Sequence, residues 1–247
     1  MTIARLGYAQ ARVQARFGDL PDARDFRLLD ASRDAAHFLE ALRVRKFARY
    51  APGLGPGVDS DGLEARLRAQ WRALCAEVAG WYDAQWREAF HVFSAYPDLA
   101  ILEYLRAGGA VANWILGDPR LAQIARGPSG LREGVVTRTY GAALGRAFSD
   151  DRPLGREWSR GWRRAWPTVE RKAEQRLLQV AREMTSPDVA SAPTALDVRS
   201  RLERLFRRSH MTAVAAFAYL AIVAVVIGHI RGGHAARLLP PPVRGWA

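Results

Sequence analysis

The sequence MTAVAAFAYLAIVAVVIGHI, at residues 211–230, has the largest influence on the fold of this chain. It contains no aspartate, glutamate, lysine or arginine, and His229 is its one titratable base, whereas a quarter of the whole chain is charged. An α-helix of about 20 apolar residues is long enough to cross the hydrocarbon core of a bilayer. A helix that is apolar on all sides can equally be buried inside a helical protein. The fold and the function therefore depend on which of these two environments surrounds residues 211–230.

The composition is that of a folded and strongly basic protein. Hydrophobic residues make up 49% of its 247 residues, enough for one large domain or two small ones with a real core. The single cysteine, Cys75, excludes an internal disulfide and a zinc site built from cysteines. The net charge of +12 is typical of proteins that bind nucleic acid or an anionic membrane surface. All but two of the 37 basic residues are arginine, however, which also fits GC-rich coding and arginines on solvated faces.

Nearly every segment has the apolar spacing of an amphipathic helix, and the alternation of a half-buried strand is absent, so we predict an all-α fold. The longest predicted helix covers residues 63–93 and follows an N-cap at Asp59 or Ser60; it is either a continuous structural spine or kinked near Gly80. Residues 130–148 are ambiguous, because VVTRTY favours a strand. The other predicted helices cover residues 3–17, 21–30, 33–43 after an N-cap at Ser32, 97–108, 110–117, 119–125, 153–185 with a break at Pro167, and 196–208.

The turn-forming residues divide the chain into two expected parts. Residues 1–185 form the main helical body. Residues 186–247 form a linker, SPDVASAPTAL at 186–196, followed by a C-terminal helical hairpin that carries the strongly apolar helix 211–230. The three prolines at 240–242 prevent that helix from continuing to the end of the chain.

The motifs of common catalytic and cofactor sites are absent from the sequence. GLGPG at 53–57 follows no predicted strand and is interpreted as a turn, and neither a zinc-binding spacing nor a nucleophile elbow occurs. The five histidines are not paired at ligand spacing on any one helix. Glu170 and Glu174 lie four residues apart on an arginine-rich helix, where exposed ion pairs explain them. We therefore expect a protein that is not an enzyme and has no catalytic residues, cofactor, metal or small-molecule ligand.

Three tryptophans lie at helical spacing and alternate with arginines. We interpret them first as a core-facing stripe flanked by solvated arginines. The alternative is an exposed face that anchors the chain at a membrane interface or stacks on single-stranded nucleic acid. If the chain has one functional surface, this face is the candidate interface, which consists of Trp158, Trp162, Trp166, Arg160, Arg163 and Arg164.

Three segments resemble the V-type ATPase C/d-subunit family. YAQARVQARFGDL at 8–20 is similar to the family's opening helix with its Tyr-x-x-Ala-Arg pattern, which here is Tyr8, Ala11 and Arg12. Residues 28–54 resemble the next family segment, with a Leu-Leu pair, an amphipathic helix and a turn centred on tyrosine. The late family helix has the form Phe-x-Tyr-Leu, then Ile-Arg and a glycine. The matching residues of the last two segments are Leu28, Leu29, Tyr50, Ala51, Pro52, Phe217, Tyr219, Leu220, Ile230, Arg231 and Gly232.

The resemblance implies a structural component of a rotary ATPase. Members of this family are all-α and consist of multi-helix lobes in a funnel-like arrangement. They sit on the cytoplasmic face of the membrane as peripheral proteins. There they form a socket that couples the central-stalk subunits to the membrane rotor ring for ion or proton transport, and they catalyse nothing themselves. The partners expected from the resemblance are therefore the stalk subunits and the rotor ring.

Two other interpretations remain open at the level of sequence. Residues 211–227 have Thr212 and Tyr219 as their only polar side chains, with Arg207, Arg208 and His210 before them and Arg231 after them, as in a single membrane span. The chain would then be a helical protein with a C-terminal membrane anchor. The high net charge allows a basic helical protein that binds nucleic acid. Nucleic acid is not the partner we expect.

Overall fold

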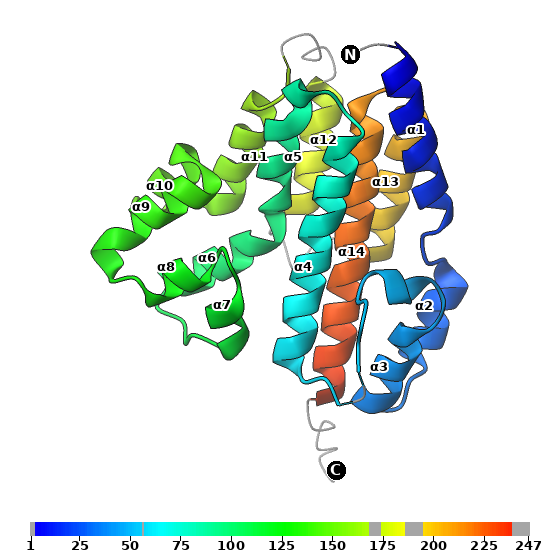
Figure 1. Cartoon of the computed structure of the whole chain (residues 1–247), viewed down its shortest axis with the longest axis horizontal. Coiled ribbons are helices and arrows are strands. Elements are labelled where there is room, and N and C mark those ends of the chain that lie inside the picture. Colours follow the sequence, from blue (N-terminus) through cyan, green and yellow to red (C-terminus); the bar gives the residue numbers. More distant parts are fainter. Residues whose placement is uncertain (1–2, 56, 168–173, 186–194, 239–247) are drawn as a thin grey trace, which may run out of the picture.

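The computed structural model describes residues 3–55, 57–167, 174–185 and 195–238, and these ranges contain helices and no strand (Figure 1). The predicted all-α fold is confirmed. The first half of the chain forms α1 (Ile3–Gly18), α2 (Ala23–Asp30), α3 (Ala35–Arg43), η1 (Arg45–Arg49), α4 (Ser60–Gly80), η2 (Ala84–Trp86), α5 (Arg87–Ser94) and η3 (Tyr96–Asp98). The second half forms α6 (Leu99–Arg106), α7 (Asn113–Gly117), α8 (Ala122–Arg126), α9 (Ser129–Tyr140), α10 (Ala142–Ser149), α11 (Leu154–Arg164), α12 (Glu174–Thr185), α13 (Ala195–Arg208) and α14 (Ala213–Leu238).

Helix α14 is the central element of the bundle. It contacts α1, α3, α4, α12 and α13, and Figure 1 shows it beside α4 along most of its length. From Ala213 to Val223 no residue is more than 1% exposed. Among the described helices it alone is long and apolar enough to cross a membrane, and 78% of its most apolar stretch is buried by the rest of the protein. Of the two environments open to residues 211–230, the structure therefore provides a protein interior.

Aromatic rings surround Phe217, near the start of α14. The ring of Phe90 stacks on it at 4.5 Å between centroids, and the Phe93 ring lies at 5.2 Å. The rings of Trp162 and Trp166 follow at 5.0 and 5.2 Å. This cluster joins α5, α11 and α14 into one core.

The long helix predicted for residues 63–93 is neither continuous nor kinked but broken into separate helices. Its N-cap is Asp59, one of the two predicted residues, and the Asp59 carboxylate accepts a hydrogen bond of 2.7 Å from the backbone N–H of Gly62. Helix α4 ends at Gly80, and α5 begins at Arg87 and runs back along it. The break is complete because Trp81 and Tyr82, in the turn, are themselves buried in the core.

The predicted N-cap of α3 is wrong by two residues. Asp34, and not Ser32, precedes the helix, and its carboxylate accepts a hydrogen bond of 2.9 Å from the backbone N–H of His37. Both residue types can cap a helix. Burial of Phe38, Leu39 and Leu42 determines which of the two lies next to the first helical turn.

Helices α6 to α10 form a side lobe that projects from the bundle (Figure 1). The ambiguous residues 130–148 belong to it and form two helices, α9 and α10, so the strand suggested by VVTRTY is absent. Gly141, with a φ of 96°, separates the two helices. Gly145 lets them approach closely, because a Cβ there would lie 1.9 Å from Thr137 Oγ1. Packing of Val135 and Val136 against the core thus outweighs the strand preference of valine and threonine.

Helices α13 and α14 form the predicted C-terminal hairpin, and α14 inserts between helices of the first 185 residues. The linker predicted at 186–196 falls mostly on residues 186–194, which lie outside the described ranges, as do residues 168–173 after the expected break at Pro167. Helix α11 ends at Arg164, and α12 begins at Glu174.

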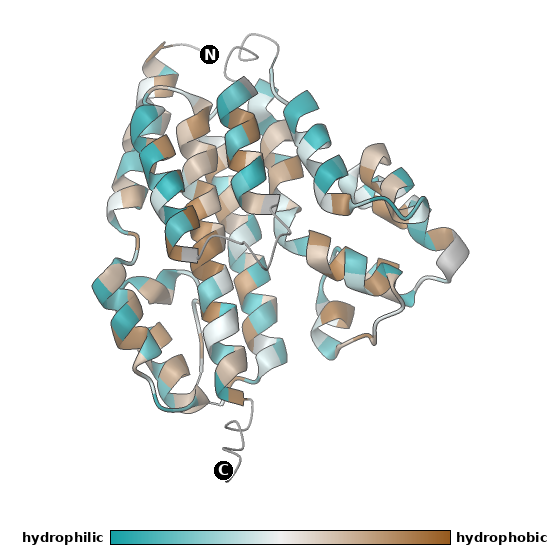
Figure 2. Cartoon of the chain, turned by 180° about the vertical axis from the view of Figure 1, so that it is seen from behind, coloured by the Kyte–Doolittle hydropathy of each residue, from teal (hydrophilic) through white to brown (hydrophobic). Residues whose placement is uncertain are grey.

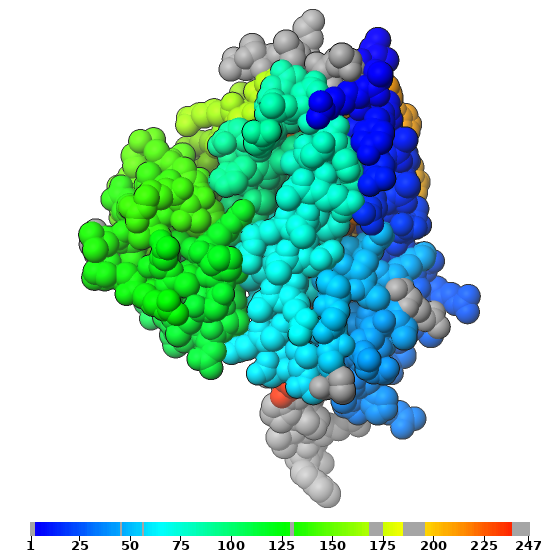
Figure 3. Space-filling view, viewed as in Figure 1, coloured from blue at the N-terminus to red at the C-terminus, as the bar shows by residue number. Residues whose placement is uncertain are grey.

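The exterior agrees with a bundle that buries one face of each outer helix. In Figure 2 the outer helices alternate between hydrophilic and hydrophobic residues. In Figure 3 the side lobe and the bundle are packed against each other. The described residues thus form a bundle with one side lobe, and the funnel-like arrangement implied by the resemblance stays a prediction.

The Phe217→Ala substitution tests the core around α14. Deleting a fully buried ring from this cluster is expected to lower the free energy of unfolding by about 3–5 kcal/mol, measured by urea denaturation. Leu131→Ala is the control, because Leu131 is 65% exposed and its loss should cost less than about 0.5 kcal/mol. Equal costs for the two substitutions would contradict the central position of Phe217.

Candidate functional site

The structure buries the three tryptophans of the candidate interface. Trp158 and Trp162 are 0% exposed and Trp166 is 4% exposed. The Trp158 indole N–H donates a hydrogen bond of 2.7 Å to the carbonyl of Val92. The core-stripe interpretation is therefore confirmed for these residues, and the alternative of an exposed tryptophan face is wrong. The physical reason is that this face of α11 packs on α5 and on Phe217.

The three arginines of the candidate interface remain at the surface. Arg160, Arg163 and Arg164 are all exposed. The Arg160 guanidinium donates a hydrogen bond of 2.6 Å to the Glu157 carboxylate on the same helix. A partner can reach these arginines, so their part in an interface stays a prediction.

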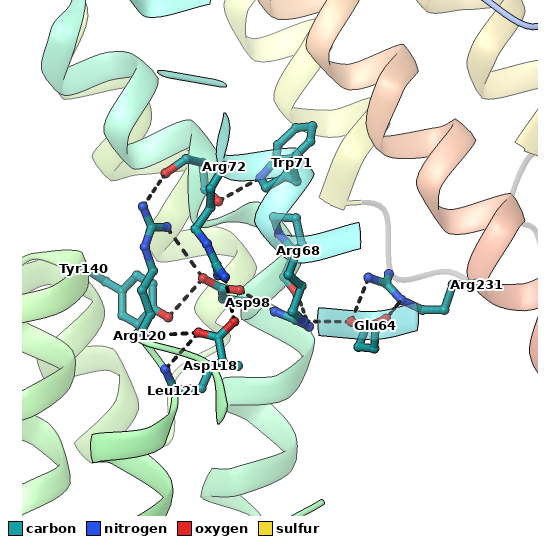
Figure 4. A network of polar contacts seen from close by, with 12 residues as sticks. Glu64, Arg68, Trp71, Arg72, Asp98, Asp118, Arg120, Leu121, Tyr140 and Arg231 are labelled. Atoms are coloured by element: carbon teal, nitrogen blue, oxygen red, sulfur yellow. Dashed lines mark hydrogen bonds and ion pairs between the residues drawn. The ribbon is translucent and has the colours of Figure 1, made fainter. Parts of the chain in front are cut away.

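A buried network of charged side chains joins the bundle to the side lobe (Figure 4). Its centre is Asp98, at the end of η3, which is 2% exposed. The Asp98 carboxylate accepts a hydrogen bond from the Arg68 guanidinium and one of 3.0 Å from the Tyr140 hydroxyl. The Arg120 guanidinium lies 3.7 Å from the same carboxylate. Residues of α4, of α9 and of the turn before α8 thus meet at one buried charge.

Arg68 carries the network from the side lobe to the central helix. Its guanidinium donates hydrogen bonds of 3.1 Å to the carbonyl of Pro97 and 2.7 Å to the Glu64 carboxylate, and it lies 4.6 Å from the Trp114 ring centroid. Glu64 in turn accepts two hydrogen bonds from Arg231 of α14, at 2.6 and 2.9 Å. Charges of alternating sign therefore connect α14 to α4 and α4 to the side lobe.

Asp118 forms the second branch of the network. Its carboxylate accepts a hydrogen bond of 2.9 Å from the Arg72 guanidinium, and hydrogen bonds of 2.9 and 3.2 Å from the backbone N–H groups of Arg120 and Leu121. The Arg120 guanidinium reaches on to the hydroxyl of Ser94, in α5, at 3.0 Å. This branch fixes the turn between α7 and α8 against α4 and α5.

The two carboxyl groups that Arg68 contacts, those of Glu64 and Asp98, differ in their titration. Burial raises the pKa of Asp98 above its ordinary value of 3.8, and the Arg68 and Arg120 guanidinium groups oppose this rise. Burial alone would raise the pKa of Glu64, but hydrogen bonds and ion pairs with Arg231 and Arg68 hold this pKa below its ordinary value of 4.5. Burial raises the pKa of the Cys75 thiol and of the Tyr140 hydroxyl, so both stay protonated at neutral pH. Each carboxylate of the network faces a guanidinium. In the part of the chain that the structure describes, no group of three or more histidine, cysteine, aspartate or glutamate side chains is placed to hold a metal ion.

Sequence reasoning missed this network. Glu64 and Arg68 stand four residues apart on α4, and such pairs are usually exposed and weak. Arg68 directly follows Leu67 of the apolar stripe, and this position next to the stripe is the signal that could have indicated burial. Asp98 and Asp118 are adjacent to Pro97 and Gly117, so in the sequence they resemble ordinary turn residues.

The comparisons with known proteins give no match: no family model, no curated protein and no solved structure matches this chain. The function therefore has to be inferred from the sequence resemblance and from the geometry of the fold.

The Glu64→Gln substitution tests the buried network through its pH dependence. The pKa of Glu64 is lower in the folded state than in the unfolded state. The ionised Glu64 side chain therefore stabilises the folded protein above its unfolded pKa, and this stabilisation is lost as the pH falls through the folded pKa. We expect the variant to be about 2 kcal/mol less stable than the wild type at neutral pH, and this difference to shrink below about pH 4. Urea denaturation at a series of pH values measures both quantities.

The control is Glu88→Gln, because Glu88 is exposed and has no ion-pair partner among the described residues. Its stability should follow that of the wild type at every pH. A Glu64→Gln difference that stays constant as the pH falls would contradict the account of the Arg68–Glu64–Arg231 pairs.

Proposed function

We propose that this chain is a non-catalytic subunit of a V-type or A-type rotary ATPase. In this role it is a rigid socket that couples the central stalk to the membrane rotor ring. It associates peripherally with the cytoplasmic face of the membrane. The proposal rests on the resemblance to the V-type ATPase C/d-subunit family and on the way in which the resembling segments pack.

The observation that carries the proposal is that the three resembling segments form one contiguous body. Helix α1 packs on α14, and the backbone N–H of Met211, just before α14, donates a hydrogen bond of 3.1 Å to the Gln10 side-chain carbonyl of α1. His229 of α14 lies 2.8 Å from the carboxylate of Asp30, in the second segment. The Arg237 guanidinium donates hydrogen bonds to the backbone carbonyls of Asp30 and Ser32 at 2.7 and 3.1 Å. Segments from the two ends of the sequence therefore belong to a single packing unit.

Half of the fourteen resembling residues are packing residues, whereas Tyr8, Ala11, Arg12, Leu28, Pro52 and Gly232 are exposed. Leu29, Tyr50, Phe217, Tyr219 and Ile230 are all buried, with exposures of 0–1%. Buried side chains of this kind determine the shape of the protein and do not contact a substrate. Their burial supports a structural role more than an enzymatic one.

The stiffness of the body also supports a role in passing torque. Close-packed interiors have low compressibility and transmit strain. The charged network adds directional contacts, because Arg231 of α14, Glu64 and Arg68 of α4, and Asp98 of η3 form a continuous chain of hydrogen bonds. A load applied to the side lobe would thus reach the central helix through specific bonds.

A second candidate is a helical protein with a C-terminal membrane anchor. The feature that favours it is the length and apolarity of α14. The burial of α14 favours the peripheral role, because insertion into a bilayer would require removing α14 from α1, α3, α4, α12 and α13. The apolar faces of those five helices would then be exposed to water unless other residues packed against them.

Washing membranes with alkaline carbonate distinguishes the two candidates. The peripheral protein is expected in the supernatant, and a tagged copy purified from detergent-solubilised membranes is expected to bring central-stalk and rotor-ring subunits with it. Retention in the washed membrane pellet would instead establish the anchor. Release without any other rotary ATPase component in the tagged preparation would overturn the proposed function.

A further inference from the structure

A groove of about 500 Å³ lies between the C-terminal half of α4 and helix α5. It shares Phe90 with the aromatic cluster around Phe217, and Arg72 and Arg120 of the charged network reach its edge. The two helices lie side by side and antiparallel (Figure 1), and the face on which they meet is seen in Figure 3. We call this feature the α4–α5 groove.

The floor of the α4–α5 groove is made of one face of each helix. Between Arg72 and the end of α4, the lining residues of this helix are Cys75, Ala76, Ala79 and Gly80, which follow helical spacing and are all small. Phe90 lines it from α5. Small side chains let the backbone of another helix come close, and two parallel rows of side chains form the kind of groove that accepts an amphipathic helix.

The two ends of the groove are basic. Arg5 and Arg87 line the end near Gly80, and Arg72 and Arg120 line the end near Ser94. The lining contains four arginines and one acid, Asp83, which lies 3.1 Å from Arg5. Arg87 is exposed and has no ion-pair partner among the residues that the structure describes. Three of the four arginines lie beside a carboxylate, of Asp83, Asp118 or Asp98, and the excess of guanidinium groups over these carboxylates favours an anionic occupant.

The buried carboxylates beneath the groove hold two of these arginines in place. Asp118 binds Arg72, and Asp98 lies beside Arg120. Both aspartates are buried, at 4% and 2% exposure, so they orient the guanidinium groups without being available to a ligand. The arginines at this end are thus fixed before any partner arrives, which lowers the entropic cost of binding.

The spacing of the two basic ends selects the kind of occupant. Arg72 and Gly80 are separated by eight positions of α4, which is about 12 Å along the helix axis. A single phosphate cannot bridge guanidinium groups at both ends. A helix with carboxylates seven residues apart places them about 10 Å apart and on one face, which matches the two ends.

We propose that the α4–α5 groove binds an amphipathic helix of a partner protein, with one carboxylate at each basic end and small apolar residues between them. One carboxylate meets Arg72 and Arg120, and the other meets Arg5 and Arg87. This inference does not depend on the rotary ATPase proposal, because it is defined by the chemistry and spacing of the groove.

A synthetic peptide tests the groove directly. The probe is a fluorescently labelled helical peptide of about 15 residues with two glutamates seven positions apart and alanine and leucine between them on the same face. Fluorescence anisotropy with the full chain is expected to show saturable binding that weakens as salt is raised. The same peptide with both glutamates replaced by glutamine is expected to bind at least tenfold more weakly.

Two substitutions locate the binding on the chain. Arg87→Glu reverses a charge at one end, and Ala76→Trp fills the floor at an exposed position; each is expected to weaken peptide binding at least tenfold. The control is Arg138→Glu, which makes the same change of net charge at an exposed position of α9, in the side lobe. It should leave the affinity unchanged, and circular dichroism should show that all three variants keep the wild-type melting temperature.

Three results would overturn the proposal. The first is no binding of the glutamate peptide up to about 1 mM, the weak end of specific affinities. The second is equal loss in Arg87→Glu and Arg138→Glu, which would indicate non-specific attraction to a basic protein. The third is full competition by inorganic phosphate at low millimolar concentration, which would indicate a small-anion site. None of these results bears on carbonate extraction or on copurification with a rotary ATPase, so this proposal and the proposed function can fail separately.

Discussion

The burial of the first half of α14, from Ala213 to Val223, governs how the other helices are arranged. A helix with apolar side chains on every face must be covered on every face, and α1, α3, α4, α12 and α13 provide that cover. The hydrophobic free energy scales with the apolar area removed from water, so a helix buried from Ala213 to Val223 contributes a large share of the stability. Each covering helix needs only one apolar face, and its other face can carry the arginines that make the chain basic.

The buried charged side chains attach the side lobe to this bundle in a defined orientation. Arg68 and Asp98 are both nearly inaccessible, and a buried charge is tolerated only when it is paired and hydrogen-bonded. Apolar packing alone has little directional preference, whereas the hydrogen bonds of Arg68 to Glu64, Pro97 and Asp98 permit only a narrow range of geometries. The proposed socket and the proposed helix-binding groove both use this fixed junction.

The helices were easier to predict from the sequence than the site was. Helical spacing indicated the all-α fold, the Asp59 cap and the core stripe of Trp158, Trp162 and Trp166, because these depend on nearest neighbours along one helix. The break of residues 63–93 into two helices was underestimated, and residues 130–148 were left ambiguous, because burial in the assembled core determined both. The charged network was missed, since its partners come from several elements and each residue by itself resembles a surface charge or a turn.

The amino-acid sequence was enough to establish that the chain is helical and basic, and that one helix has no polar face. It could not establish what surrounds that helix, because length and apolarity are the same for a membrane span and for the core helix of a bundle. In the folded chain, five helices from distant parts of the sequence surround α14, which is the observation that favours the core helix. Packing also buried the tryptophans and gathered the arginines of α4, α5 and α1 around one groove, because the grouping of residues far apart in sequence follows from tertiary contacts and not from local pattern.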